Sequence, residues 1–299
     1  MAQAVDPGAG WGLRREYLEK GNSGGALVAV LPGGRLHLQH GPIDIVAQAF
    51  GEAAAVRAAY ARAAARFATV LEELVAELLA LRREDAVVSG EIARAMAAAV
   101  APFRPSFVTP MAAVAGAVAD AVLATMVGPG IARAYANNGG DIAVFLAPGQ
   151  VLTCALAGAK GGVQMRAEDR TRGIATSGCG GRSFSFGIAD AVTVLARTAA
   201  MADAAATMIA NAVDLPGHPG VLRRPAKALQ ADSDLGARLV TVAVPELSAA
   251  EAEVALDAGL RVAQGYLARG LIEGAGLFLQ GNSVATGVLA LPVRENEHV

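Results

Sequence analysis

The segment 201–207 constrains the fold most, because it is nearly all alanine and carries only two polar side chains. Alanine has the highest helix propensity, so this run predicts a helix over residues 199–213. Asp203 and Thr207 are four residues apart and would share one helix face, among small methyl groups. Two such oxygens, together with water, suit a cation such as Mg²⁺ that holds a phosphate-bearing ligand. The alternative is a solvated polar stripe that also includes Asn211.

The composition indicates a globular chain with a large core built from small residues. Of the 299 residues, 54% are hydrophobic, 17% are charged and only 4% are aromatic, so alanine and glycine carry much of the packing. That composition favours close contact between helices and a sheet. The most apolar window, 107–127, contains Pro110 and a central Asp120, which favours a buried helix over a membrane span.

The charge and the cysteine content limit which classes of binding partner and which cellular compartment we expect. The net charge is −2 and no basic tract occurs, which argues against nucleic acid as the main partner. Cys154 and Cys179 show no disulfide or metal spacing and indicate reduced thiols. Residues 1–10 lack the features of a signal peptide. We therefore expect a cytoplasmic protein that does not bind a membrane. The sequence also allows a homo-oligomer.

Hydrophobic periodicity predicts an α+β protein of mixed strands and helices, without the regular alternation of a doubly wound sheet. Glycine and proline at 148–149 predict a hairpin between strands 141–146 and 151–157, whereas 215–225 is expected to be a loop. Ser248 and Glu251 form a capping box for the last helix. The other expected strands are 26–30, 36–46, 174–178, 190–196, 237–244, 277–280 and 285–291, and the expected helices are 51–83, 91–100, 111–125, 199–213 and 248–269.

Two glycine-rich turns and one buried carboxylate are further candidate ligand contacts. The loop 176–183 could point backbone N–H groups at a phosphate, or it could be a flexible turn; its candidate contacts are Thr176, Ser177, Gly178 and Arg182. The turn 137–141 could bring the backbone close to a planar or phosphate ligand, or it could be an ordinary Asn-Gly turn; its candidates are Asn138, Gly139 and Gly140. Asp120 needs a helix N-terminus, a backbone donor or an ion as partner. Cys179 is either reactive or a small packing residue.

Taken in order, these segments resemble the motifs of the ApbE superfamily of flavin transferases, which take FMN from FAD. The matching stretches are 115–120 (Ala-Gly-Ala-Val-Ala-Asp), 137–141 (Asn-Asn-Gly-Gly-Asp), 175–178 (Ala-Thr-Ser-Gly) and 202–207 (Ala-Asp-Ala-Ala-Ala-Thr), within a motif core of about 107–213. The chain is more similar still to a branch of that superfamily, uncharacterised protein family two-eight-zero. That likeness rests on 110–120, 180–190 and the run 233–236 (Ser-Asp-Leu-Gly).

The resemblance implies a single ApbE-like, T-fold-related domain over 1–299, with mixed sheets, two interleaved lobes and a ligand cleft between them. It implies that Asp203 and Thr207 hold Mg²⁺ beside FAD or a related flavin or nucleotide. The superfamily lysine is Ala115 here, its His-x-x-Asp-Pro element is replaced at 185–189, and 215–247 has the character of a family-specific insertion.

The resemblance therefore leaves three functions open. The first is metal-assisted transfer, or cleavage of a pyrophosphate in a phosphate-bearing small molecule. The second is a flavin- or pterin-binding protein without transferase activity. The third is a subunit of a cofactor or one-carbon pathway assembly.

Overall fold

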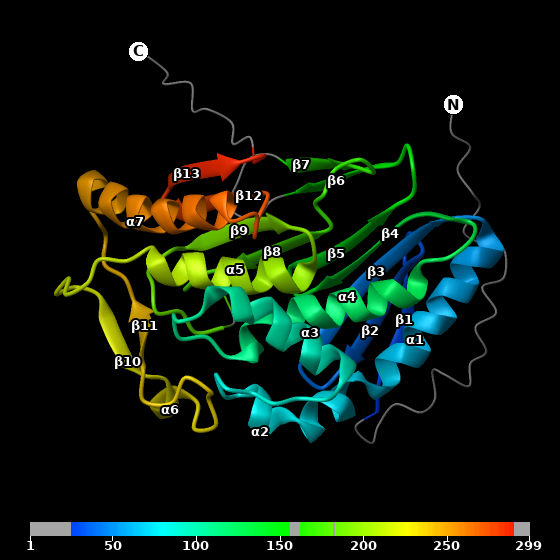
Figure 1. Ribbon diagram of the computed structural model, residues 1–299, viewed down its shortest axis with the longest axis horizontal. Helices are drawn as coiled ribbons and strands as arrows, with labels where there is room; N and C mark the ends of the chain where they lie inside the picture. The colour runs from blue at the N-terminus through cyan, green and yellow to red at the C-terminus, as the bar shows by residue number, and fades with distance from the viewer. Residues whose placement is uncertain (1–24, 156–161, 182, 290–299) are drawn as a thin grey trace, which may run out of the picture.

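A nine-stranded sheet forms the centre of the protein, and its neighbouring strands are antiparallel throughout. The computed structural model describes residues 25–155, 162–181 and 183–289. The strand order is β1-β2-β3-β4-β5-β8-β9-β12-β13 (Figure 1). The bounds are β1 (Leu27–Leu31), β2 (Arg35–His40), β3 (Ile43–Gly51), β4 (Ile131–Asn138), β5 (Asp141–Leu146), β8 (Gly173–Ser177), β9 (Ala191–Ala196), β12 (Gly274–Leu279) and β13 (Asn282–Gly287).

The long helices lie against one face of this sheet (Figure 1). Two short ribbons, β6–β7 and β10–β11, form separate two-stranded sheets. This arrangement confirms the predicted mixed α+β class. The bounds are α1 (Ala53–Ala76), α2 (Leu78–Leu81), α3 (Glu91–Val100), η2 (Ala101–Phe103), η3 (Pro110–Ala113), α4 (Val114–Met126), α5 (Ala199–Ala212), α6 (Ala226–Leu229), α7 (Ala249–Ala268), β6 (Val151–Ala155), β7 (Gly162–Arg166), β10 (Leu222–Pro225) and β11 (Leu239–Ala243).

Side-chain alternation decides which face of the sheet the helices cover. In β2 and β3 every second side chain is buried, as a half-buried antiparallel strand requires. Helix α1 buries a stripe with three- and four-residue spacing that faces these strands: Val56, Ala59, Tyr60, Ala63, Phe67, Val70 and Leu74. Tyr60 fixes the contact, because its hydroxyl donates to Gly34 O at 2.6 Å and accepts from Ala49 N.

Two hydrophobic cores lie on opposite faces of the sheet. The larger core fills the space between the sheet and the helices. The smaller core contains Val144, Ile174 and Leu195 of the sheet together with Val163 and Met165 of β7. The β6–β7 ribbon therefore packs on the face of the sheet that the long helices leave open.

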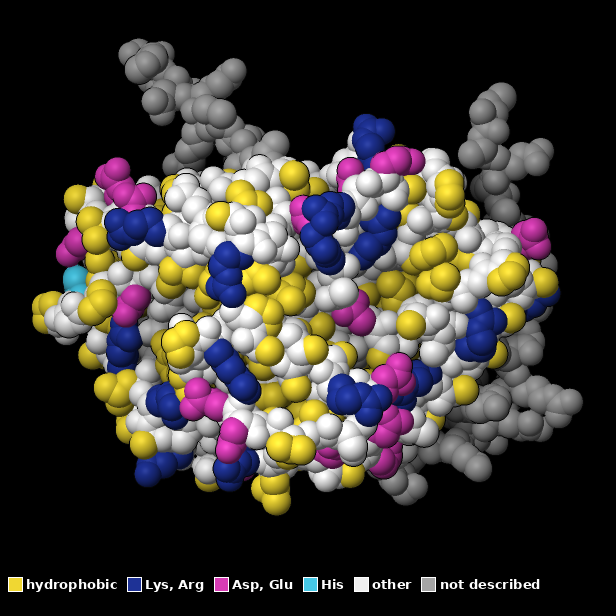
Figure 2. Space-filling view, in the orientation of Figure 1, with side chains coloured by type: hydrophobic (Ala, Val, Ile, Leu, Met, Phe, Trp, Pro, Cys, Tyr) yellow, Lys and Arg dark blue, Asp and Glu magenta, His cyan; other side chains and the backbone are white. Residues whose placement is uncertain are grey.

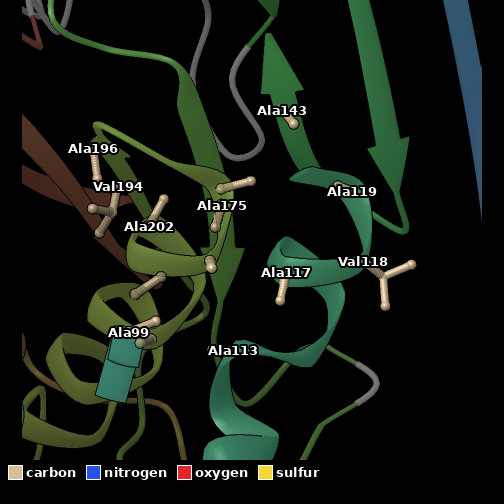
Figure 3. Packing of buried hydrophobic residues seen from close by; sticks show 14 of the residues in the cluster. Ala99, Ala113, Ala117, Val118, Ala119, Ala143, Ala175, Val194, Ala196 and Ala202 are labelled. Carbon is tan, nitrogen blue, oxygen red and sulfur yellow. The ribbon is translucent and has the colours of Figure 1, made fainter. Parts of the chain in front are cut away.

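Helices α4 and α5 approach each other very closely because their contact is built from small residues. Figure 3 shows this region, where alanines of α4 and α5 pack with Ala143 and Ala175 of the sheet. A Cβ added to Gly116 of α4 would lie 2.2 Å from the carbonyl oxygen of Ala199 at the start of α5. The alanine-rich composition is thus what permits the close packing expected from the sequence.

The two helices also exchange hydrogen bonds at their first turns. Asp120 of α4 accepts from the N–H groups of Ala199 and Ala200 at 3.1 and 2.9 Å, in the first turn of α5. Asp203 of α5 accepts from Gly116 N at 3.0 Å, in the first turn of α4. Each aspartate thereby satisfies backbone donors that a helix start leaves unpaired.

Several expectations need correction, and the hairpin predicted between 141–146 and 151–157 is wrong. Strand β5 pairs with β4 and β8, while β6 pairs with β7, so the turn at 148–149 joins strands of different sheets. The expected strand 36–46 is two strands, because Gly41 adopts a positive φ of 55° between β2 and β3. The expected loop 215–225 ends in strand β10.

Other local predictions are confirmed. The capping box is present, since the side chains of Ser248 and Glu251 each accept from the other residue's backbone N–H. In the parts of the chain that the structure describes, no helix is long and apolar enough to cross a membrane. The expectation for residues 1–10 falls outside the described residues.

Candidate functional site

The polar face of α5 contacts three different segments of the chain. Asp203, Thr207 and Asn211 follow one another at intervals of four residues. Asp203 binds the first turn of α4, Thr207 donates to Ser177 Oγ at the end of β8 (3.5 Å), and Asn211 accepts from Phe186 N at 2.9 Å. These side chains are partly buried rather than solvated, so the stripe is a contact surface inside the molecule.

The first turn of α4 is held from two sides at this place. Asn138, at the end of β4, is buried and donates from Nδ2 to Ala115 O at 3.1 Å. Asp203 accepts from the next residue, Gly116, through Oδ2. The two motifs that contain Asn138 and Asp203 are therefore joined through the backbone of a third, although they are 65 residues apart in the sequence.

Asp141 is a member of this cluster that sequence reasoning did not select. It is the first residue of β5, only 9% exposed, and its Oδ1 accepts from Thr176 N at 3.2 Å. Burial, followed by the charge of Asp141, holds the pKa of the Asp203 carboxyl well above its usual range. Two buried carboxylates that repel each other form a place where a cation would be favourable. Its position directly after the two glycines of the turn was the available signal.

The last two residues of β8 point to opposite faces of the sheet. Ser177 lies on the α5 face beside Thr207. The side chain of Thr176 lies on the other face, where its hydroxyl is 2.9 Å from the hydroxyl of Thr193 on β9. Strand alternation requires this separation. Only the backbone N–H of Thr176 therefore reaches the cluster.

In the glycine-rich turn that follows, some backbone N–H groups already have acceptors within the protein. Cys179 N donates to Ala189 O at 2.8 Å and Gly181 N to Gly178 O at 3.2 Å. A Cβ on Gly178 would lie 2.4 Å from Asp190 O, so this glycine permits a close approach of two backbones. Arg182 is outside the described residues. Burial raises the pKa of the Cys179 thiol, which disfavours the reactive thiolate.

The glycines of the other turn are at the surface. Gly139 and Gly140 have φ values of 66° and 115° and connect β4 to β5, while Asn137 Oδ1 accepts from Gly140 N at 2.8 Å. The positive φ values and this hydrogen bond are those of an Asn-Gly turn. Its effect on the cluster is to place Asn138 and Asp141 next to each other, as a directly paired position of β4 and β5. A ligand contact of Gly139 and Gly140 stays a prediction.

Asp120 has the helix N-terminus as its partner, one of the options expected for it. Desolvation raises its pKa to about 6, while the two N–H donors of α5 oppose that rise. A cofactor-binding role for Asp120 stays a prediction.

Replacing Asp120 with alanine should leave two N–H groups of α5 without an acceptor and lower the free energy of unfolding by about 2 kcal/mol at pH 6. The wild-type folded-state pKa of about 6 exceeds the unfolded-state pKa. The folded state therefore binds the extra proton in that window, and this carboxyl makes stability fall as pH rises from about 4 to 6. The variant should lose that slope in urea titrations. Asp257→Ala, at an exposed position of α7, is the control, and an equal loss in both variants would contradict the prediction.

The cluster as a whole offers oxygens rather than a ready-made metal cage. Among the described residues, no group of three or more His, Cys, Asp or Glu side chains is placed to hold a metal ion. The oxygens come from Asp203, Asp141, Thr207 and Ser177, so water or ligand oxygens would have to complete a coordination shell. On the helical face of the molecule, hydrophobic side chains gather in the middle, and side chains of both charges, Lys and Arg as well as Asp and Glu, are scattered around them (Figure 2).

The fold and this site define an α+β protein in which two helices, a β-turn and a strand end converge on a carboxylate and hydroxyl cluster. The chain belongs to the family described as AbpE bacteria, whose profile matches residues 28–285.

Three relatives, all described as UPF0280 proteins, are similar to part of this chain. The chain is 41% identical over 117 residues to a UPF0280 protein of Methanococcoides burtonii, which covers 38% of this chain and 48% of that protein. It is 42% identical over 111 residues to a UPF0280 protein of Methanothrix thermoacetophila, with 36% and 46% covered, and 39% identical over 109 residues to one of Methanobrevibacter smithii, with 35% and 46% covered. The matched stretch spans about half the length of these relatives.

Proposed function

We propose that this protein binds Mg²⁺ together with a flavin or nucleotide that carries a pyrophosphate, in an ApbE-like cleft beside α5. The observation that carries the proposal is the convergence of Asp203, Thr207, Asp141 and Ser177, which come from three separate segments. The name of the matching family, AbpE bacteria, supports the ApbE-like part of the proposal. The apolar centre of the helical face suits a ligand with a planar ring, and the Lys and Arg side chains near it could contact phosphates.

In such a site, each residue of the cluster would interact with either the cation or the phosphate. Asp203 and Thr207 would hold the cation, and Asp141 would add negative charge from the sheet side. The hydroxyl of Ser177 would contact a phosphate oxygen. When bound, Mg²⁺ neutralises the charge that develops on a pyrophosphate as a P–O bond breaks. This supports metal-assisted transfer or cleavage at a pyrophosphate as the reaction class.

A binding protein without transferase activity is the second candidate, and one observation favours it. The segment that replaces the superfamily's His-x-x-Asp-Pro element is used for packing: Ser185 is 3% exposed and donates to Asn211 Oδ1 at 3.3 Å. Residues 185–189 contain no group that would serve as an acid or base near neutral pH.

A thermal-melting series tests the proposal. FAD, FMN, ADP and a pterin are each added with and without MgCl₂, and the melting temperature is recorded. We expect a Mg²⁺-dependent rise with at least one pyrophosphate compound. Analysis of the FAD sample for FMN and AMP then separates the two candidates, since turnover supports the enzyme and binding without products supports the binding protein. The absence of any Mg²⁺-dependent shift would overturn the Mg²⁺-dependent site, and the absence of a shift with every ligand, with or without MgCl₂, would overturn both candidates.

A further inference from the structure

The segment 215–247, which contains β10, α6 and β11, is attached to the body of the protein beside both ends of the polar face of α5. At one end, Thr241 N donates to Ser185 O at 2.9 Å and Arg223 Nη1 donates to Phe186 O at 2.7 Å. Ser185 and Phe186 are the residues that bind Asn211. At the other end, Asp234 accepts from the hydroxyl of Thr109, which leads into α4.

Thr109 occupies a position where a local helix cap would be expected. It is the N-cap of η3, and a threonine there commonly accepts from an N–H of the first turn. Among the described residues no such side-chain cap forms, and the hydroxyl instead donates to Asp234 Oδ2. Ala113, the N-cap of α4, has no side chain that could cap. The bond to the distant segment therefore holds the entry to α4, in addition to the contacts that Asn138 and Asp203 make with its first turn.

Aromatic and charged contacts reinforce that attachment. The guanidinium of Arg238 lies 3.3 Å from the ring centroid of Phe107, two residues before Thr109. The Phe107 ring is in turn 6.1 Å from that of Phe186. Thr109 itself is only 2% exposed, so its hydroxyl needs the partner that Asp234 supplies.

The path from this bond to the candidate metal site is short. Thr109 O accepts from Ala112 N at 3.1 Å within η3, and α4 begins directly after η3 at Val114. Gly116, seven residues after Thr109, donates to Asp203. A displacement of Thr109 would therefore be transmitted through η3 and its junction with α4 at Ala113 to the donor that orients the Asp203 carboxylate.

We propose that Asp234 is a positioning residue for the metal site, which it controls through Thr109 and the first turn of α4. The inference rests on the proposed function, because it assigns the 215–247 segment a role in tuning that same site. Groups that hydrogen-bond a metal ligand directly, as Gly116 does, affect metal affinity by about 10-fold or more when they are removed. Asp234 acts on that donor, so we expect an effect at the lower end of this range. The segment is then a part of the site's support, and not only an addition to the surface.

Isothermal titration of the full-length protein with MgCl₂ tests this assignment, with the metal-free melting temperature as a separate measure of stability. Thr109→Val and Asp234→Ala should each weaken Mg²⁺ binding about 10-fold. Thr109→Ser and Asp234→Asn, which keep the donor or an acceptor oxygen, should restore the affinity to within about threefold. Combining Thr109→Val with Asp234→Ala should add little further loss, as expected for two members of one bond.

Asp232→Ala is the matched control within the same segment. Asp232 pairs with Arg82 at 2.7 Å, but its side chain is 63% exposed and its contact leads to α2 and not to α4. A merely structural role of the segment would lower the melting temperature in all these variants and leave Mg²⁺ affinity unchanged. Unchanged Mg²⁺ affinity in Asp234→Ala overturns the inference. Because Asp234 is partly exposed, this variant provides the test if Thr109→Val fails to fold. Wild-type protein that binds no Mg²⁺ overturns the metal site itself.

Discussion

Asp203→Asn is expected to abolish the Mg²⁺-dependent rise in melting temperature and, at neutral pH, to make the metal-free protein more stable. The asparagine keeps an oxygen that can accept from Gly116 N, so the contact with α4 survives. What is lost is the charge. A ligand that saturates the wild type at 100 times its Kd stabilises it by about 2.7 kcal/mol, and the variant should show none of this.

The stabilisation of the metal-free variant follows from the raised pKa of Asp203. Burial and the charge of Asp141 raise the pKa in the folded state above its value in the unfolded state. Ionisation therefore opposes folding at neutral pH, and the penalty disappears as pH falls below about 4. Removing the ionisable group should raise the metal-free melting temperature by about 2–4 °C per kcal/mol recovered.

Melting curves at pH 5 and pH 7.5, with and without MgCl₂ and FAD, check both parts. Asp257→Asn on the exposed side of α7 is the control, because it changes the net charge by the same amount away from the cluster. A variant that keeps the wild-type Mg²⁺ response would remove Asp203 from the site. A less stable metal-free variant would show that its carboxylate is compensated in the folded protein.

Gly116→Ala should destabilise the protein by about 3 kcal/mol and weaken Mg²⁺ binding as well. The added Cβ would lie 2.2 Å from Ala199 O and 2.4 Å from Ala199 C, both backbone atoms that no rotamer change can move. Helices α4 and α5 would have to separate. This separation would also displace the Gly116 N–H, which donates a hydrogen bond to Asp203.

Gly265→Ala in α7 is the matched control, since a Cβ there meets no atom within 4 Å. Alanine in an exposed helix position stabilises by about 0.5–1 kcal/mol relative to glycine. Urea denaturation of the two variants should therefore shift the midpoint in opposite directions. Equal midpoints would mean that the two helices yield without cost.

The sequence predicted the helices better than the strand partners. The helices over 91–100, 199–213 and 248–269 carry their own periodicity, the last two also have side-chain caps, and the structure has all three within one residue at each end. Strand β4 was missed because its sequence, Ile-Ala-Arg-Ala-Tyr-Ala-Asn-Asn, has few strand-forming residues. Its place between β3 and β5 imposes the extended conformation. The pairing of β6 with β7 likewise depends on tertiary contacts and not on the turn that precedes it.

The candidate site was predictable only where spacing within one element defines it. The interval between Asp203 and Thr207 is a property of any helix, and it held. The contribution of Asp141, the separation of Thr176 from Ser177 and the contact of Gly116 with Asp203 depend on how the sheet and α4 are placed. Those are relations between segments that no local pattern contains.

Because α4 and α5 exchange hydrogen bonds, substitutions at two positions far apart in the sequence are coupled. A substitution that removes the acceptor oxygens of Asp120 would leave N–H groups at the start of α5 unpaired, and one that removes the acceptor oxygen of Asp203 would do the same at the start of α4. Neither helix can therefore be redesigned or transplanted alone, although 83 residues separate the two carboxylates. In relatives of this chain, a change at one aspartate should be accompanied by a new acceptor for the opposite helix.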